Sequence, residues 1–118
     1  NQGYAAFAPP EGPYAAAPRP VDAILCGDFN SAPDDDVYGC LTEPIAGGCG
    51  FQDAWRICHG DRPHAPTCGI FDRRQWPQGP HCRDFFFVAG TPAQSIQDVQ
   101  VNEETDASDH QPVLLAMG

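Results

Sequence analysis

Residues 23–30 read Ala-Ile-Leu-Cys-Gly-Asp-Phe-Asn, and residues 83–89 read Arg-Asp-Phe-Phe-Phe-Val-Ala. These two stretches decide the fold, because each holds a continuous apolar run, which is the pattern of a strand buried on both faces. We therefore expect strands over residues 21–29 and 85–89. In the first of them Cys26 is expected to be a small buried hydrophobe.

Weaker patterns surround these two strands. Acidic residues 34–36 predict the start of a helix that runs to about Leu41, because negative charge in a first turn complements the helix dipole. The remaining predicted elements are a short helix or irregular segment over residues 51–57, a more exposed strand over 95–101 and a final buried strand over 112–117. Four strands with one or two short helices predict a layered α/β or α+β fold.

The length of 118 residues suits one domain, which we place at residues 21–118. Residues 1–20 are rich in Pro, Gly and Ala, and they predict an extended linker or a disordered segment. Residues 59–81 form a long loop, and a loop of that length usually carries function or lacks order. The only methionine is Met117, so we expect a processed product or a fragment of a longer protein.

The composition restricts the partners. The chain has no lysine, six basic residues against 16 acidic ones and a net charge of −10, which argues against a surface that grips duplex nucleic acid. A divalent cation would still let an acidic protein act on a phosphoester. No apolar run is long enough to span a membrane, and a cytoplasmic location is the default expectation.

A carboxylate and a carboxamide follow the first predicted strand. Asp28 and Asn30 are two residues apart, so on an extended segment both side chains point to the same side. There a carboxylate orients or deprotonates a water molecule, and an amide donates a hydrogen bond to a phosphoryl oxygen. The alternative is that Asp28 and Asn30 simply make a turn.

A second pair precedes the last predicted strand. Asp109 and His110 are adjacent, so they can splay, with Asp109 reaching a metal ion and His110 facing a phosphate. A histidine used in this way needs a partner on its other ring nitrogen, and Asp84 at the start of the aromatic strand is the natural candidate. The alternative is that Asp109 caps a turn and His110 is a surface residue.

Four segments together resemble, in chain order, the later motifs of the endonuclease/exonuclease/phosphatase superfamily. They are residues 24–31 (ILCGDFNS), 51–56 (FQDAWR), 83–88 (RDFFFV) and 108–113 (SDHQPV). Residues 67–69 (Thr-Cys-Gly) fall where that family often carries a threonine-containing loop. The resemblance covers about residues 21–117 and implies the C-terminal half of a four-layer α/β/β/α sandwich of the DNase I-like type.

The resemblance also implies chemistry. It implies hydrolysis of a phosphoester (nucleic acid, lipid or small molecule) that depends on Mg²⁺ or Mn²⁺, with a phosphodiesterase slightly ahead of a phosphomonoesterase. Asp28 would activate the attacking water, and Asn30 would contact the scissile phosphate. Asp109 would lie at the metal ion, and His110, oriented by Asp84, would bind the phosphate.

This chain departs from the family pattern in two ways. Phe85 stands where the family usually has tyrosine, and Cys82 stands where it often has arginine, with Arg83 one place off. The larger departure is the family's N-terminal half, which supplies an asparagine and a glutamate to the metal and has no counterpart in this sequence. We therefore expect the missing half to be a partner of this chain.

Other interpretations stay open. The loop over residues 59–81 is the best candidate for substrate contact through Arg73, Arg74 and Trp76, although Trp76 would serve equally as an anchor of the loop. The chain would also suit a binding module that kept the scaffold without catalysis. A further alternative is a small domain stabilised by Zn²⁺, with ligands drawn from Cys58, His59, His64, Cys68, His81 and Cys82.

Overall fold

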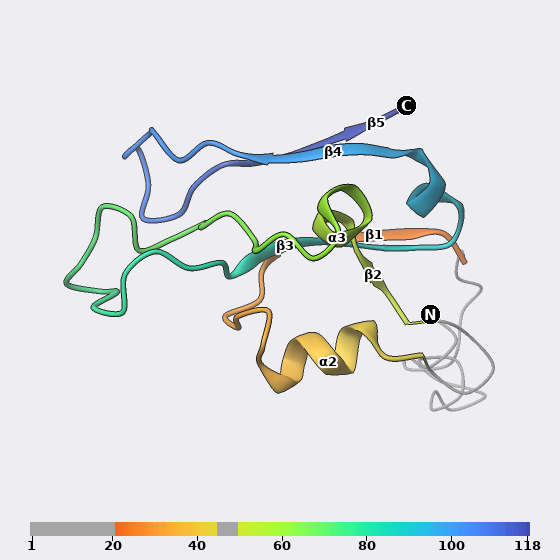
Figure 1. Ribbon diagram of the computed structural model, residues 1–118, viewed down its shortest axis with the longest axis horizontal. Helices are drawn as coiled ribbons and strands as arrows, with labels where there is room; N and C mark the ends of the chain where they lie inside the picture. The colour runs from red at the N-terminus through yellow and green to blue at the C-terminus, as the bar shows by residue number, and fades with distance from the viewer. Residues whose placement is uncertain (1–20, 45–49) are drawn as a thin grey trace, which may run out of the picture.

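A computed structural model describes residues 21–44 and 50–118 (Figure 1). The linker predicted at residues 1–20 lies outside the described residues. The strands are β1 (Ala23–Asp28), β2 (Gln52–Asp53), β3 (Asp84–Ala89), β4 (Ile96–Val101) and β5 (Val113–Met117). The helices are α2 (Asp36–Thr42), α3 (Ala54–His59) and the 3-10 helix η1 (Thr91–Ser95). Each predicted strand and helix is present, whereas β2 and η1 were not predicted.

The strands form two antiparallel sheets. One sheet has the order β1-β3-β2 and the other pairs β4 with β5. In Figure 1 the β4–β5 pair lies on one side of β3 and α2 lies on the other side. The described residues therefore form a mixed α+β fold, which agrees with the predicted class.

Strand β3 lies at the centre of the core. Phe85 and Phe87 pack with Cys82 toward α2, in a cluster that also holds Tyr38 and Leu41. On the opposite face of the sheet a second cluster packs α3 against β4 and β5: Ala54, Trp55 and Val99, with Phe86, Val113 and Leu115 at its margin. The aromatic run is therefore continuous because both faces of β3 are covered.

Two strands are less buried than predicted. Ile24 and Leu25 of β1 are 45% and 40% exposed, and Leu114 of β5 is 63% exposed; Cys26 is exposed as well. The expectation of two fully buried strands and a buried Cys26 was therefore wrong. The physical reason is that β1 pairs with β3 alone and β5 with β4 alone, so each is an edge strand among the described residues.

Candidate metal and phosphate site

Two carboxylates meet where β1 ends and β3 begins. The antiparallel register places Asp28 opposite Asp84, and residues directly opposite each other project from the same face of a sheet. Like charges so close together repel, which is costly unless a cation or a proton donor lies between them. The last residue of β1 lies beside the first residue of β3 because the two strands are antiparallel.

His110 supplies the third group of this site. Its Nδ1 atom lies 2.8 Å from Oδ2 of Asp84, and its Nε2 atom lies 3.7 Å from Oδ2 of Asp28. Ligand atoms of the three residues all lie within 4.8 Å of one another, which makes this group a candidate to hold a metal ion. The hydrogen bond that the sequence analysis expected between His110 and Asp84 is present, and its catalytic role stays a prediction.

Three distant chain segments are joined at this place by backbone pairing. Cys68 forms isolated antiparallel bridges with both His81 and His110. The amide of Gln111 donates to the carbonyl oxygen of Thr67 at 2.7 Å, and the amide of Cys68 donates to that of His81 at 3.1 Å. His110 is therefore held beside the sheet although it lies outside the named strands.

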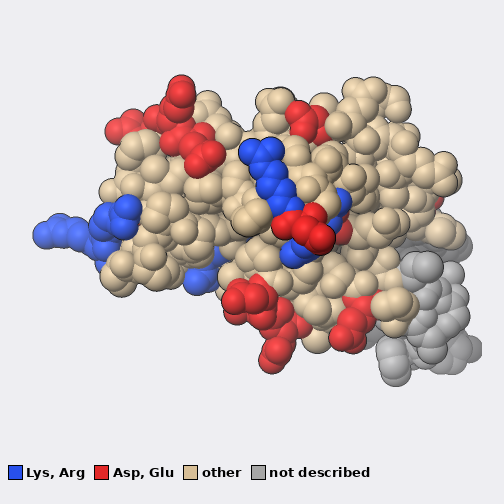
Figure 2. Space-filling model, viewed as in Figure 1, with Lys and Arg blue, Asp and Glu red and all other residues tan. Residues whose placement is uncertain are grey.

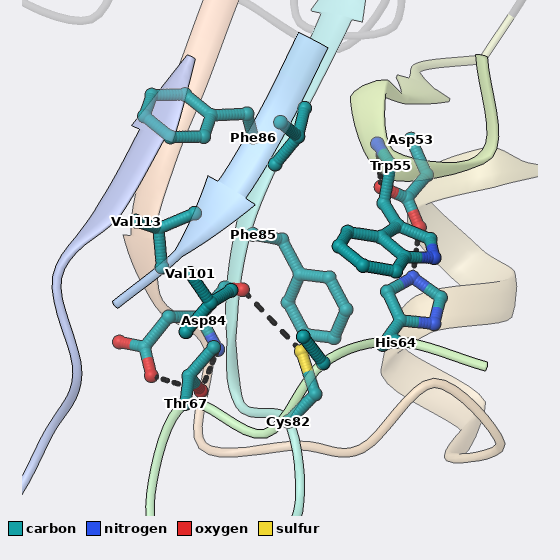
Figure 3. A pocket seen from close by; sticks show the side chains of 12 residues that line it. Asp53, Trp55, His64, Thr67, Cys82, Asp84, Phe85, Phe86, Val101 and Val113 are labelled. Atoms are coloured by element: carbon teal, nitrogen blue, oxygen red, sulfur yellow. Dashed lines mark hydrogen bonds and ion pairs between the residues drawn. The ribbon is translucent and has the colours of Figure 1, made fainter. Parts of the chain in front are cut away.

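Thr67 orients the Asp84 carboxylate. Its hydroxyl group donates to Oδ2 of Asp84 at 2.6 Å and accepts from the backbone amides of Arg83 (2.9 Å) and Asp84 (3.2 Å). Thr67 is 1% exposed, and Figure 3 shows it facing Asp84 beside a narrow cavity between the two sheets. The sequence predicts no role for Thr67 beyond its place in the loop of the resembled family, because an isolated threonine in an irregular loop carries no periodic signal.

The carboxylates favour the charged form of His110. Partial burial by itself lowers the pKa of the imidazole, but the hydrogen bond to Asp84 and the charges of Asp84, Asp28 and Asp109 outweigh it. The net result is a pKa of His110 above its ordinary value. Since Asp84 accepts from Nδ1, the Nε2 atom is the one left for a ligand or a proton donor.

Asn30 lies in a turn rather than on an extended segment. Its φ is 51°, and its backbone amide donates to Oδ1 of Asp28 at 2.8 Å. Strand β1 ends at Asp28, so the premise that Asp28 and Asn30 point to one side of an extended strand was wrong. The turn that the sequence analysis kept as an alternative is the observed conformation.

Asp109 lies outside the group formed by Asp28, Asp84 and His110. It is exposed, accepts from the Ser108 hydroxyl at 3.3 Å and lines an open depression together with Phe71, Asp72, Asp106, Ser108 and Gln111. The structure therefore brings His110 to the carboxylates of the sheet but does not place Asp109 among them.

The predicted substrate residues fall in different places. Trp76 lies near the site, with its ring centroid 6.3 Å from that of His110 in an edge-to-face arrangement. Arg73 and Arg74 are exposed, and no contact of theirs with the three site residues is present. Arg83, which the sequence analysis treated only as a shifted family arginine, instead has its guanidinium carbon 4.7 Å from the Trp76 ring centroid.

The cysteines and histidines of the zinc alternative do not form a set of three or more ligands among the described residues, although Sγ of Cys68 lies 3.3 Å from Nε2 of His81. Each histidine ring bonds a separate group: His59 the carbonyl oxygen of Val99 (2.9 Å), His64 the carboxylate of Asp53 (2.5 Å) and His81 the carbonyl oxygen of Gly79 (2.7 Å). Burial, followed by the charge of Asp84, raises the pKa of Cys68 to about 11.

Comparison of this chain with protein-family models, with curated proteins and with solved structures gives no match. Over the described ranges, none of the helices has the length and apolar character that crossing a bilayer requires.

Proposed function

We propose that this chain carries the phosphate-handling part of a divalent-metal-dependent phosphoester hydrolase. The observation that carries the proposal is the group of Asp28, Asp84 and His110, whose ligand atoms lie within 4.8 Å of one another. Two carboxylates with one oriented imidazole match what hydrolysis of a phosphoester needs: a base, a proton donor and oxygen ligands for a cation.

The donor set fits Mg²⁺ or Mn²⁺. Carboxylate oxygens of Asp28 and Asp84 are ligands that both ions accept, and the Nε2 atom of His110 is left free to donate to the phosphate. When bound, such a cation supplies charge that offsets the negative phosphate. The family resemblance implies that Asp109 also binds the metal, and that role requires its exposed side chain to join the group of Asp28, Asp84 and His110.

Three residues of this chain supply the base, the hydrogen-bond donor to the phosphate and the positioning contact. Asp28 accepts the proton of the attacking water, because its carboxylate lies at the open end of β1 and is partly exposed. His110, held by Asp84, donates from Nε2 to a phosphoryl oxygen as negative charge builds on it. Thr67 acts through Asp84, because its hydroxyl group holds one carboxylate oxygen in place.

The family resemblance extends this proposal to the fold. Helix α2, the β1-β3-β2 sheet and the β4–β5 pair would be three adjoining parts of a four-layer DNase I-like sandwich. The exposed apolar side chains of Ile24, Leu25 and Leu114 support a missing half, because an edge strand with apolar side chains normally has a covering partner. That half would also supply the glutamate ligand, which the group of three residues lacks.

The test is hydrolysis of bis(p-nitrophenyl) phosphate and p-nitrophenyl phosphate by the protein with Mg²⁺, with Mn²⁺ and with EDTA. We expect activity only with a divalent ion, more on the diester than on the monoester. His110→Ala and Asp28→Asn should each lower the rate by about 100-fold or more. Asp61→Asn is the matched control, because this exposed aspartate lies in the loop after α3, away from the site.

Two results would overturn the proposal. One is hydrolysis that continues in EDTA at the same rate, and the other is full activity in His110→Ala.

A binding module of the same fold is the second candidate. It is favoured by two observations: Asn30 is held in a turn, and Asp109 lies outside the group of three. In that case Mn²⁺ binds the wild-type protein and binds Asp28→Asn more weakly in calorimetry, while neither phosphate ester is hydrolysed.

A further inference from the structure

Arg83 is a cation that two contacts hold in one place. Its Nε–H donates to Nε2 of His81 at 2.8 Å, and its guanidinium group lies over the ring of Trp76. His81 can accept this bond because its Nδ1 atom lies 2.7 Å from the carbonyl oxygen of Gly79 and donates there. A guanidinium fixed in this way loses little conformational entropy when it binds a ligand.

No carboxylate neutralises this cation among the described residues. All four ion pairs of the described chain involve histidine, and none involves Arg83. The other described arginines, Arg56, Arg62, Arg73 and Arg74, make none either, so what qualifies Arg83 is its fixed position beside the candidate site. A half-buried, oriented arginine without a carboxylate partner is ready to receive an anion.

Arg83 belongs to the same surface as the candidate site. The bridges from Cys68 to His81 and to His110 place these three side chains on one face of a small paired region. Trp76 lies against that face, with ring centroids 5.1 Å from His81 and 6.3 Å from His110. One tryptophan ring therefore contacts both the site histidine and the guanidinium of Arg83.

The groups near this ring offer hydrogen-bond donors. A guanidinium has five N–H groups and no acceptor, and only the Nε–H of Arg83 is engaged by a described residue. The remaining N–H groups of the guanidinium therefore match a ligand that carries anionic oxygens. The indole Nε1 atom of Trp76 also has no hydrogen-bond partner among the described residues, but it is buried and is not counted among these donors.

We propose that Arg83, held by Trp76 and His81, binds a second phosphate group of a small substrate whose scissile phosphate lies at His110. The proposal deepens the function proposed above and rests on it. A small molecule is favoured over a polymer because one arginine contacts one anionic group. Figure 2 also shows several separate groups of acidic side chains on the face in view and no continuous basic surface.

This proposal gives Trp76 a role other than the predicted contact with the substrate. The face of its ring is covered by the guanidinium group of Arg83, so that face is not open to stack on a substrate. Trp76 is a positioning residue that holds the arginine.

The experiment compares two ligands that differ by one phosphate group. Calorimetry with Ca²⁺ in place of the activating ion measures the binding of adenosine 3′,5′-bisphosphate and of adenosine 5′-monophosphate to the protein. We expect the bisphosphate to bind about tenfold more tightly, which is the size of effect of one charged hydrogen-bonded contact. Arg83→Gln should remove this difference and leave the affinity for the monophosphate unchanged.

Two further variants keep the result interpretable. Arg83→Lys retains the positive charge without the planar donors and should restore part of the difference. Arg62→Gln makes the same change of charge at an exposed position and should leave both affinities unchanged. Equal affinities of the wild-type protein for the two ligands would overturn the proposal, as would a preference that survives in Arg83→Gln.

This binding assay is independent of turnover. If Arg83→Gln loses the preference while no ester is hydrolysed, the anion subsite stands and the hydrolase proposal fails. If hydrolysis requires His110 but the preference for two phosphates is missing, the hydrolase proposal stands and the role of Arg83 is wrong.

Discussion

Individual hydrogen bonds decide the geometry of the site, and the hydroxyl group of Thr67 makes three of them. It donates to Asp84 and accepts from two backbone amides. These amides belong to residues at the start of β3, so the same hydroxyl group fixes both the carboxylate and the backbone that carries it. Loss of this one oxygen atom therefore affects stability as well as the site.

We expect Thr67→Val to lower the free energy of unfolding by about 2 kcal/mol, because two buried amides lose their acceptor while the shape of the side chain is kept. Thr67→Ser keeps the hydroxyl group and should cost less than about 1 kcal/mol. Urea titrations followed by circular dichroism measure both values. Equal losses in the two variants would contradict this expectation, because they would mean that the methyl group contributes as much as the hydroxyl group.

The charge of His110 makes stability depend on pH. Its pKa in the folded protein lies above the ordinary value of 6.5, so the folded state binds the proton more tightly than the unfolded state does. The resulting stabilisation is fully present below about pH 6.5 and is lost as the pH rises through the raised pKa. In EDTA, the difference in melting temperature between wild type and His110→Gln should therefore shrink from pH 6 toward pH 9. A difference that grows over this interval would contradict the assigned direction of the shift.

Helix α3 depends on a buried carboxylate at its start. Oδ1 of Asp53 accepts from the amide of Trp55 at 2.9 Å, and Oδ2 contacts the Tyr38 hydroxyl (2.8 Å) and Nε2 of His64 (2.5 Å). Asp53 is 4% exposed and lies beside the cavity drawn in Figure 3. This helix is only six residues long, so its cap and its packing stabilise it more than its own hydrogen bonds do.

Asp53→Ala should lower the free energy of unfolding by about 3 kcal/mol or more, because it leaves three buried groups without a partner. The contrasting variant is Asp98→Ala, since the ion pair of Asp98 with His59 is longer, at 3.4 Å, and more exposed. That change should cost less than about 1 kcal/mol. Chemical denaturation compares the two variants, and a similar loss in both would mean that burial does not strengthen the Asp53 contacts.

The elements themselves were largely predictable, but their burial was not. The aromatic run of β3 and the acidic start of α2 follow from local sequence and are present. The exposure of β1 could not be read from its apolar run, because burial depends on which neighbours cover a strand. The same limit applies to Asn30, whose turn conformation depends on how the chain leaves β1.

The parts of the candidate site that lie beside a strong strand pattern were predictable from the sequence. Asp84 could be matched to His110 because each stands beside a strong strand pattern, and their hydrogen bond is present. Thr67 lies in an irregular loop and Arg83 lies beside it. The sequence of such a loop has no hydrophobic periodicity from which side-chain contacts could be predicted. The bridges through Cys68 and the hydrogen bonds of Thr67 reveal that this loop lies against the site.

At the scale of the whole molecule, apolar side chains remain at the surface of both sheets. Leu25 of β1 and Leu114 of β5 are 40% and 63% exposed. Exposed edge strands with apolar side chains favour association with other chains. The chain on its own should therefore self-associate as its concentration rises.

Sedimentation velocity over a range of concentrations tests this expectation. The double variant Leu25→Thr, Leu114→Thr should shift the population toward monomer, and each change should alter the free energy of unfolding by less than about 1 kcal/mol. Wild-type protein that stays monomeric throughout, with variants that are strongly destabilised, would mean that these side chains belong to the core of this chain.

The pairing of Cys68 with His81 has a consequence for how such proteins diversify. It closes the intervening loop at its base, so the loop can lengthen, shorten or change in composition without moving the residues before and after it. Thr67, Asp84 and His110 would keep their places while Trp76 and its neighbours are exchanged. A foreign loop joined at these two residues would replace Trp76, which holds Arg83, and would leave the group of Asp28, Asp84 and His110 unchanged. The proposed anion subsite could then be altered through the loop while the residues proposed for chemistry stay in place.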